Sequence, residues 1–159
     1  MSKEVIALGS DHGGFYLKSI ISKYLENLGY IVKDFGTYDD KSVDYPDYAY
    51  KVAASISRGE IERGVIICGT GIGISIAANK FPGVRAALCW DSYTAKMSRL
   101  HNNANLLALG GRIIGIELAK DILNTWLNTE FEGGRHLRRV NKIDELAAKF
   151  WLEYLEANK

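Results

Sequence analysis

Apolar runs and helical apolar stripes alternate along the chain, and this alternation predicts strands separated by helices. Short apolar runs, each closed by glycine or polar residues, predict five strands, at residues 5–9, 30–35, 64–68, 84–90 and 106–109. The second run alternates polar and apolar residues, which is typical of an edge strand. Apolar residues three and four apart predict helices, at residues 15–28, 46–58, 92–100 and 116–127, with a last helix at about 141–157.

Five strands separated by helices favour a parallel sheet covered by helices on both faces. Such sheets bind ligands beyond the carboxyl ends of their strands. Asp11 and His12 follow the first strand, and Cys68 ends the third. If these strands are neighbours, as right-handed crossovers favour, the three side chains meet in one crevice. No linker interrupts residues 1–159, so we expect a single domain.

Composition narrows the class of protein. The chain is 47% hydrophobic and 25% charged, which is enough apolar material for a buried core. Its net charge of +1 argues against nucleic acid as a partner. The apolar run near the start is too short for a signal peptide or a membrane span, so no membrane partner is expected. The two cysteines are therefore interpreted as free thiols, and the cytoplasm is the expected location.

A glycine-rich loop follows the third strand and precedes a short helix. Glycine occupies alternate positions at Gly69, Gly71 and Gly73, with Thr70 and Ile72 between them. Glycines let backbone N–H groups turn toward an anion, and the start of a helix favours negative charge. The same environment would favour the thiolate of Cys68. The loop thus indicates an anion site with a reactive thiol, although a structural glycine turn and an inert buried cysteine are the alternatives.

A dinucleotide-binding loop is a further alternative. Asp91 follows Gly69 by 22 positions, close to the acidic residue of that motif. The pattern here is G-x-G-x-G, however, and Ile74 stands where the motif's last glycine belongs. The chain also lacks a second mononucleotide-binding half, so we disfavour this interpretation.

The remaining candidates are histidines and arginines. The sequence has three histidines, none of them paired at a helical metal spacing, so we expect no metal and no cofactor. His101 ends a helix, and Arg135 and Arg139 are four apart in a basic segment that is either a solvated face or a phosphate clamp. A thiolate base, an anion hole, a histidine and a phosphate clamp together favour metal-free aldose–ketose isomerisation.

Several collinear motifs resemble the sugar-phosphate isomerase family that includes ribose-5-phosphate, galactose-6-phosphate and allose-phosphate isomerases. They cover roughly residues 4–145, and the match is weakest in the tail beyond about residue 149. The motifs are GSDHGG (9–14), SVDYPD (42–47), CGTGIG (68–73), AANK (77–80), GVRAAL (83–88), HNNAN (101–105) and GGRH (133–136) with two further arginines at 138–139.

The resemblance implies a Rossmann-like three-layer α/β/α sandwich around a five-stranded parallel sheet, and metal-free interconversion of ribose 5-phosphate and ribulose 5-phosphate. It implies that Cys68 is the proton-transferring base, that residues 69–73 form the anion hole with the Thr70 hydroxyl, and that His101 opens the sugar ring opposite Asp11. Asn102 would bind a substrate hydroxyl. The implied phosphate-side residues are His12, Arg112, Arg135 and Arg139.

The resemblance also implies a homodimer or a dimer of dimers whose active sites are completed across the interface. The last helix, at about residues 141–157, carries a broad apolar stripe that fits such an interface. Two alternatives stay open at this point. One is an isomerase for a six-carbon sugar phosphate, and the other is a sugar-phosphate-binding module without catalysis.

Overall fold

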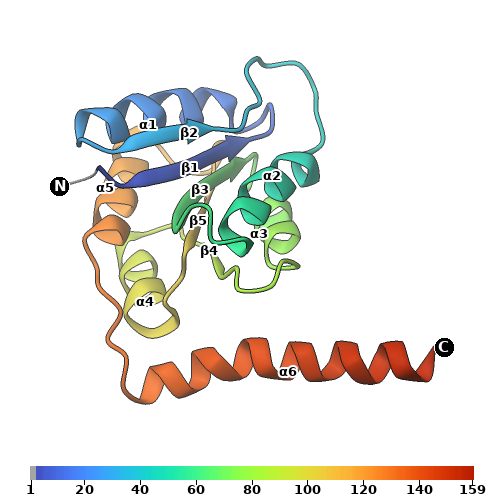
Figure 1. Cartoon of the computed structure of the whole chain (residues 1–159). Helices are drawn as coiled ribbons and strands as arrows, with labels where there is room; N and C mark the ends of the chain where they lie inside the picture. Colours follow the sequence, from blue (N-terminus) through green and yellow to red (C-terminus); the bar gives the residue numbers. More distant parts are fainter. Residues whose placement is uncertain (1–2) are drawn as a thin grey trace.

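The computed structural model describes residues 3–159 and contains a five-stranded sheet in which every strand is parallel to its neighbours. The strand order is β2-β1-β3-β5-β4, so the first and third strands are neighbours, as predicted. Figure 1 shows the sheet between two helical layers. The elements are β1 (Val5–Ser10), α1 (Phe15–Asn27), β2 (Ile31–Asp34), α2 (Tyr45–Ser57), β3 (Arg63–Cys68), α3 (Ile72–Ala78), β4 (Ala86–Leu88), α4 (Ser92–Asn102), β5 (Leu106–Gly110), α5 (Ile116–Leu127) and α6 (Arg135–Ala157).

Successive side chains on the central strands enter two separate hydrophobic cores, because strand residues point alternately to opposite faces. On β1, Ile6 and Leu8 pack with α1 and α5, while Ala7 packs with α2. The first core contains Trp126, which is fully buried. The second core contains Cys68 and Ile74 of α3. This confirms the predicted α/β fold with three layers.

The fourth strand is shorter than predicted. It spans only Ala86–Leu88 at the edge of the sheet, rather than residues 84–90. Arg85 donates its N–H to the side chain of Asn105 at 2.8 Å, so strand pairing begins only after this residue. Cys89 consequently follows the strand instead of lying inside it, although it is buried in the first core.

The last helix begins earlier than predicted. It runs from Arg135 to Ala157, so the basic segment supplies its first turn. Only His136 and Val140 are buried along it, which leaves the first turns without the apolar stripe that marks a helix in a sequence. Figure 1 shows α6 extending past the layered domain rather than packing along it. Its distal apolar residues, among them Phe150 and Trp151, are each 58% exposed.

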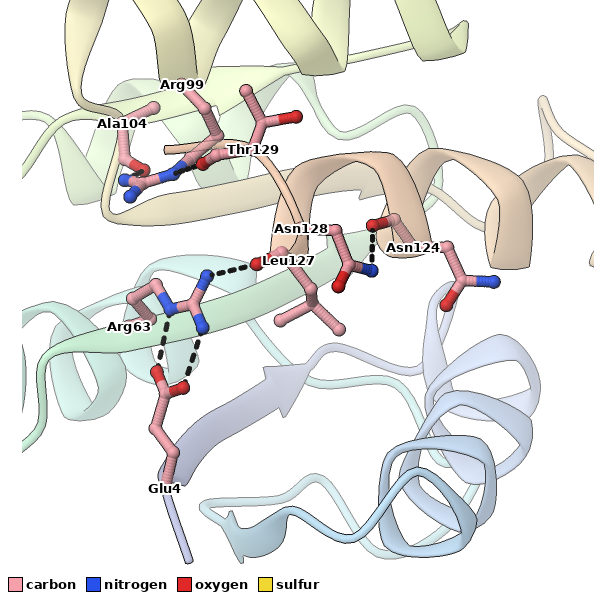
Figure 2. A network of polar contacts seen from close by, with 8 residues as sticks. All are labelled: Glu4, Arg63, Arg99, Ala104, Asn124, Leu127, Asn128 and Thr129. Carbon is pink, nitrogen blue, oxygen red and sulfur yellow. Dashed lines mark hydrogen bonds and ion pairs between the residues drawn. The ribbon is translucent and has the colours of Figure 1, made fainter. Parts of the chain in front are cut away.

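Polar contacts at the amino edge of the sheet fix the ends of α4 and α5 (Figure 2). Arg63 donates to both carboxylate oxygens of Glu4 at 2.7 Å and to the Leu127 carbonyl at 3.0 Å. Arg99 of α4 donates to the carbonyl oxygens of Ala104 at 2.7 Å and Thr129 at 3.2 Å. These contacts hold the segment after α5 against the end of α4. Within residues 3–159, no helix is long and apolar enough to cross a membrane.

Candidate active site

Cys68 lies at the carboxyl edge of the sheet, where β3 ends beside β5. Its side chain is 4% exposed, and Cys68 pairs in register with Gly110. Sγ accepts the N–H of Gly71 at 3.1 Å. The thiol is therefore held against the main chain of the glycine loop, next to the donors that could stabilise an anion.

The glycine loop turns sharply at Gly71, which has a φ of 80° and precedes α3. A Cβ there would lie 2.5 Å from Leu88 Cδ1 and 2.9 Å from the Leu109 carbonyl carbon, so only glycine fits. Thr70 and Ile72 are exposed, and the Ile72 N–H donates to Thr70 Oγ1 at 3.3 Å. The N–H groups of Gly71 and Ile72 thus donate within the loop, and the exposed Thr70 places a hydroxyl next to them.

The loop after β1 packs directly on the glycine loop. The Asp11 N–H donates to the Ile67 carbonyl at 3.2 Å, and Asp11 Oδ1 accepts the Gly14 N–H at 3.1 Å. A Cβ on Gly13 would lie 3.0 Å from the Gly69 nitrogen. The structure therefore confirms that Asp11 and Cys68 meet at one edge of the sheet. One Asp11 oxygen is engaged by its own loop.

His12 and Arg112 extend the same edge. His12 Nδ1 lies 3.2 Å from both the N–H nitrogen and the carbonyl oxygen of Val43, so the loop before α2 sits beside the site. The exposed Arg112 donates its N–H to the Gly69 carbonyl at 3.0 Å. The guanidinium of Arg112 lies over the glycine loop, and a Cβ built on Gly69 would be 3.5 Å from Arg112 Nη1.

Tyr45 is a residue of this edge that sequence reasoning did not single out. A Cβ on Gly73 would lie 2.7 Å from Tyr45 Cζ, so the aromatic ring rests on the start of α3. The signal available in the sequence was its place in the SVDYPD motif.

The other candidates lie around a second cavity, between the end of α4 and the start of α6. This cavity has a volume of about 400 Å³ and is lined by residues that include His101, Asn102 and Arg139. Arg135 and Arg139 are one turn apart on α6, and both are exposed. Arg135 reaches the cavity through His136, since Arg135 Nε donates to His136 Nε2 at 3.4 Å.

His101 is not isolated within this cavity. Its ring stacks on that of His136, with centroids 4.2 Å apart and planes 9° apart. Glu132 Oε2 lies 3.9 Å from His101 Nε2 and 3.8 Å from His136 Nε2. Burial and the neighbouring charges of His101, Arg135 and Arg139 lower the pKa of His136, while Glu132 opposes this effect. Neither spacing nor motif pairs His101 with a histidine 35 positions away, so this cluster was not predictable from the sequence.

The candidates around Cys68 lie at the carboxyl ends of the parallel strands, whereas the candidates around His101 lie near their amino ends. Helix α4 runs antiparallel to the strands, and the segment after it is tied to the start of β3, because the Gly64 N–H donates to the Asn105 carbonyl at 3.0 Å. Strand β5 then runs from Leu106 to Gly110, the residue paired with Cys68. Four strand steps of about 3.3 Å span roughly 13 Å. One chain therefore does not bring His101 to the Cys68 edge.

Comparison with known proteins defines the family. Residues 6–143 match the family described as Ribose/Galactose Isomerase. Ribose-5-phosphate isomerase B of Escherichia coli is 51% identical over 138 residues, covering 87% of this chain and 93% of that protein. D-erythrulose-4-phosphate isomerase of Pectobacterium atrosepticum is 48% identical over 140 residues, covering 87% and 91%.

A solved structure extends this likeness to the fold. The crystal structure of ribose-5-phosphate isomerase B from Mycoplasma genitalium with bound ribulose-5-phosphate has a TM-score of 0.89 and 41% identity, covering 93% of this chain and 99% of that one. The chain belongs to the Ribose/Galactose Isomerase family, and it is an enzyme of the isomerase class.

Proposed function

We propose that the chain interconverts ribose 5-phosphate and ribulose 5-phosphate, with Cys68 as the base. The observation that carries this proposal is the position of the thiol, 3.1 Å from the Gly71 nitrogen at the mouth of the glycine loop. A binding module needs no thiol among its anion donors, whereas a proton-transfer enzyme needs a base there, and a thiolate can serve as one. The E. coli and M. genitalium relatives support the five-carbon substrate.

In the proposed reaction, the Cys68 thiolate removes the proton from C2 of the open-chain aldose. The electrons of that C–H bond form the C1–C2 double bond, and the π electrons of the C1 carbonyl move onto O1. Backbone N–H groups of residues 69–73 and the Thr70 hydroxyl stabilise the resulting enediolate oxygen. The Cys68 thiol then returns the proton to C1. The proton released from O2 is transferred to O1, so that C1 becomes a CH₂OH group and O2 becomes the ketose carbonyl.

We further propose that a second copy of the chain completes each site. His101 opens the sugar ring by moving a proton from the O1 hydroxyl to the ring oxygen, with Asp11 on the other side of the substrate. Asn102 binds a hydroxyl, and Arg135 and Arg139 hold the phosphate together with His12 and Arg112 of the first copy. The separation of His101 and Cys68 within one chain supports this arrangement. A two-fold axis would then give two equivalent sites.

Helix α6 fits the same assembly. Its first turn carries the arginines. Its distal half exposes more apolar surface than a helix on the surface of a monomeric protein usually does. We propose that this half of α6 covers the partner subunit, in a homodimer or a dimer of dimers. The exposed Ile72 and Ile76 of α3 lie just beyond the glycine loop. They offer an apolar surface next to the site that the partner's arginines must reach.

Substitution of the two cysteines tests the base. Cys68→Ala should abolish exchange of the C2 hydrogen of ribose 5-phosphate with solvent, measured by NMR in D₂O. It should still bind the substrate. Cys89→Ala is the matched control, because Cys89 is equally buried but lies in the other core. Unaltered exchange in Cys68→Ala would exclude the thiol as the base.

Mixing two inactive variants tests the shared site. Cys68→Ala and His101→Ala chains, unfolded together and refolded, should recover about a quarter of wild-type activity, because half of the dimers are mixed and each has one intact site. Each variant refolded alone serves as the control. No recovery in demonstrably mixed dimers would show that His101 and Cys68 of different copies do not share a site.

Substrate length needs its own measurement. The family description names galactose, and one relative acts on a four-carbon sugar phosphate. Comparing kcat/KM for four-, five- and six-carbon phosphates separates ribose 5-phosphate from a six-carbon substrate such as allose 6-phosphate or galactose 6-phosphate.

The two free cysteines fit a reducing compartment, and we propose the cytoplasm as the location.

A further inference from the structure

Glu132 and His136 have no part in the proposed isomerisation, yet their side chains converge with His101. We propose that these three residues form a binding site for a borderline transition-metal ion such as Zn²⁺, and that the bound ion inhibits the enzyme. Both imidazole Nε2 atoms lie within 3.9 Å of Glu132 Oε2. The candidate ligand atoms of the three residues all lie within 4.8 Å of one another.

The donor set selects the class of ion. Two histidines and one glutamate, with water in the fourth position, form a tetrahedral zinc site in known metalloenzymes, with bonds of about 2.0–2.2 Å. Ligand atoms in such a site are about 3.4 Å apart, so each carboxylate–imidazole distance must close by roughly 0.5 Å. Imidazole favours Zn²⁺, Cu²⁺ and Ni²⁺, whereas Mg²⁺ and Ca²⁺ prefer oxygen ligands.

The backbone around the cluster is already in place. The side chain of His136 is 6% exposed, and the backbone N–H of His136 donates to the Gly133 carbonyl at 3.0 Å. The Glu132 N–H donates to the Leu100 carbonyl at 3.1 Å, which fixes the loop beside His101. The side chains of His101 and Glu132 are 39% and 56% exposed, so both are free to rotate. A tilt of the His101 ring out of the stack would direct both nitrogen lone pairs at one ion.

Arg135 is the competitor for this site. Its Nε donates to His136 Nε2 at 3.4 Å, so the lone pair that an ion would need points at the guanidinium. A cation binding there must displace the guanidinium, and Arg139 lines the same cavity. The expected consequence follows from the proposed function. An ion on His101 would remove the ring-opening residue and turn Arg135 away from the phosphate.

Binding is tested without reference to activity. The metal-free full-length chain is titrated with Zn²⁺ by calorimetry and with Co²⁺ by visible absorption. Because a thiolate also binds zinc, the titrations use the Cys68→Ala variant. We expect one ion per chain, and at least about tenfold weaker binding when Glu132→Gln is added. Glu130→Gln, an exposed carboxylate nearby, is the control. Loss of all binding in Cys68→Ala, or no effect of Glu132→Gln, would overturn the site.

Inhibition is tested separately. Zn²⁺ should inhibit the wild-type enzyme reversibly, with activity restored by EDTA, while Mg²⁺ should not. Glu132→Gln should raise the inhibitory concentration at least about tenfold relative to the variant's own uninhibited rate. Binding without inhibition would refute the inhibitory role. Absence of isomerase activity on every sugar phosphate would refute the proposed function and leave the titrations as evidence on the metal site.

Discussion

Substitution of Gly71 by alanine tests the idea that the glycine loop is shaped by close packing of the main chain. Gly71 has a φ of 80°, and its N–H donates to Cys68 Sγ. Alanine in this left-handed conformation costs about 1–2 kcal/mol. The added Cβ would also lie 2.5 Å from Leu88 Cδ1 and 2.9 Å from the Leu109 carbonyl carbon. Overpacking of this kind costs about 1–3 kcal/mol.

Gly59→Ala is the matched control for this experiment. Gly59 has a φ of 72°, but a Cβ there meets nothing within 4 Å. It should therefore show only the conformational cost, about 1–2 kcal/mol. Gly71→Ala should lose about 2–5 kcal/mol in total. At roughly 2–4 °C per kcal/mol for a chain of this size, its Tm should fall by about 4–20 °C.

Urea and thermal unfolding at one fixed protein concentration measure both variants, because association changes apparent stability. In the proposed site, Gly71→Ala should also lower kcat by about 10²-fold, because alanine keeps the N–H but its Cβ must displace the loop beside Cys68, and a shift of about 1 Å has an effect of this size. Equal stability losses in the two variants, with full activity in Gly71→Ala, would refute the packing argument. An activity loss without the extra destabilisation would show that the loop moves to accommodate the Cβ at little cost in stability.

Three further predictions concern stability. Arg63→Lys should lower the free energy of unfolding in urea by about 1–3 kcal/mol, because lysine cannot reproduce the paired bonds to Glu4, and this loss should shrink in a Glu4→Gln background. Asp91→Ala should cost about 1 kcal/mol, because Asp91 Oδ1 caps α4 by accepting the Thr94 N–H at 2.7 Å; an unchanged urea midpoint would contradict this. Burial raises the pKa of the Cys89 thiol, so its contribution to stability is full below about pH 8.5 and is lost as pH rises through the raised pKa. Cys89→Ala should therefore show a shallower alkaline loss of stability than wild type, and identical slopes would argue against it.

The sheet was predictable because its signals are local. The apolar runs around Val65 and Leu107 are long enough to mark buried strands, and the alternation after Tyr30 marked an edge strand that the structure places at the edge. Sequential crossovers also made β1 and β3 neighbours, which brought Asp11 to Cys68. These inferences required only periodicity and the handedness of connections.

The start of α6 and the histidine cluster were not predictable in the same way. Helix signals depend on a repeated apolar face, and α6 begins with charged residues around His136. The stacking of His101 on His136 depends on where the loop after α5 returns to α4. That return is fixed by Arg99, whose donation to the Thr129 carbonyl has no signature in the sequence.

Main-chain packing at the carboxyl edge has a consequence for how new substrates could be acquired. A Cβ on Gly110 would lie 2.7 Å from the Thr70 carbonyl oxygen, and one on Gly111 would lie 2.8 Å from that of Gly13. In the proposed site, the reacting end of the substrate therefore faces a surface that point substitutions can rarely reshape. Substitutions that change the accepted length of the sugar must therefore occur in residues that surround this edge, such as Asn102 and the loop around Val43. Divergence within such a scaffold would change what is isomerised while leaving how it is isomerised untouched.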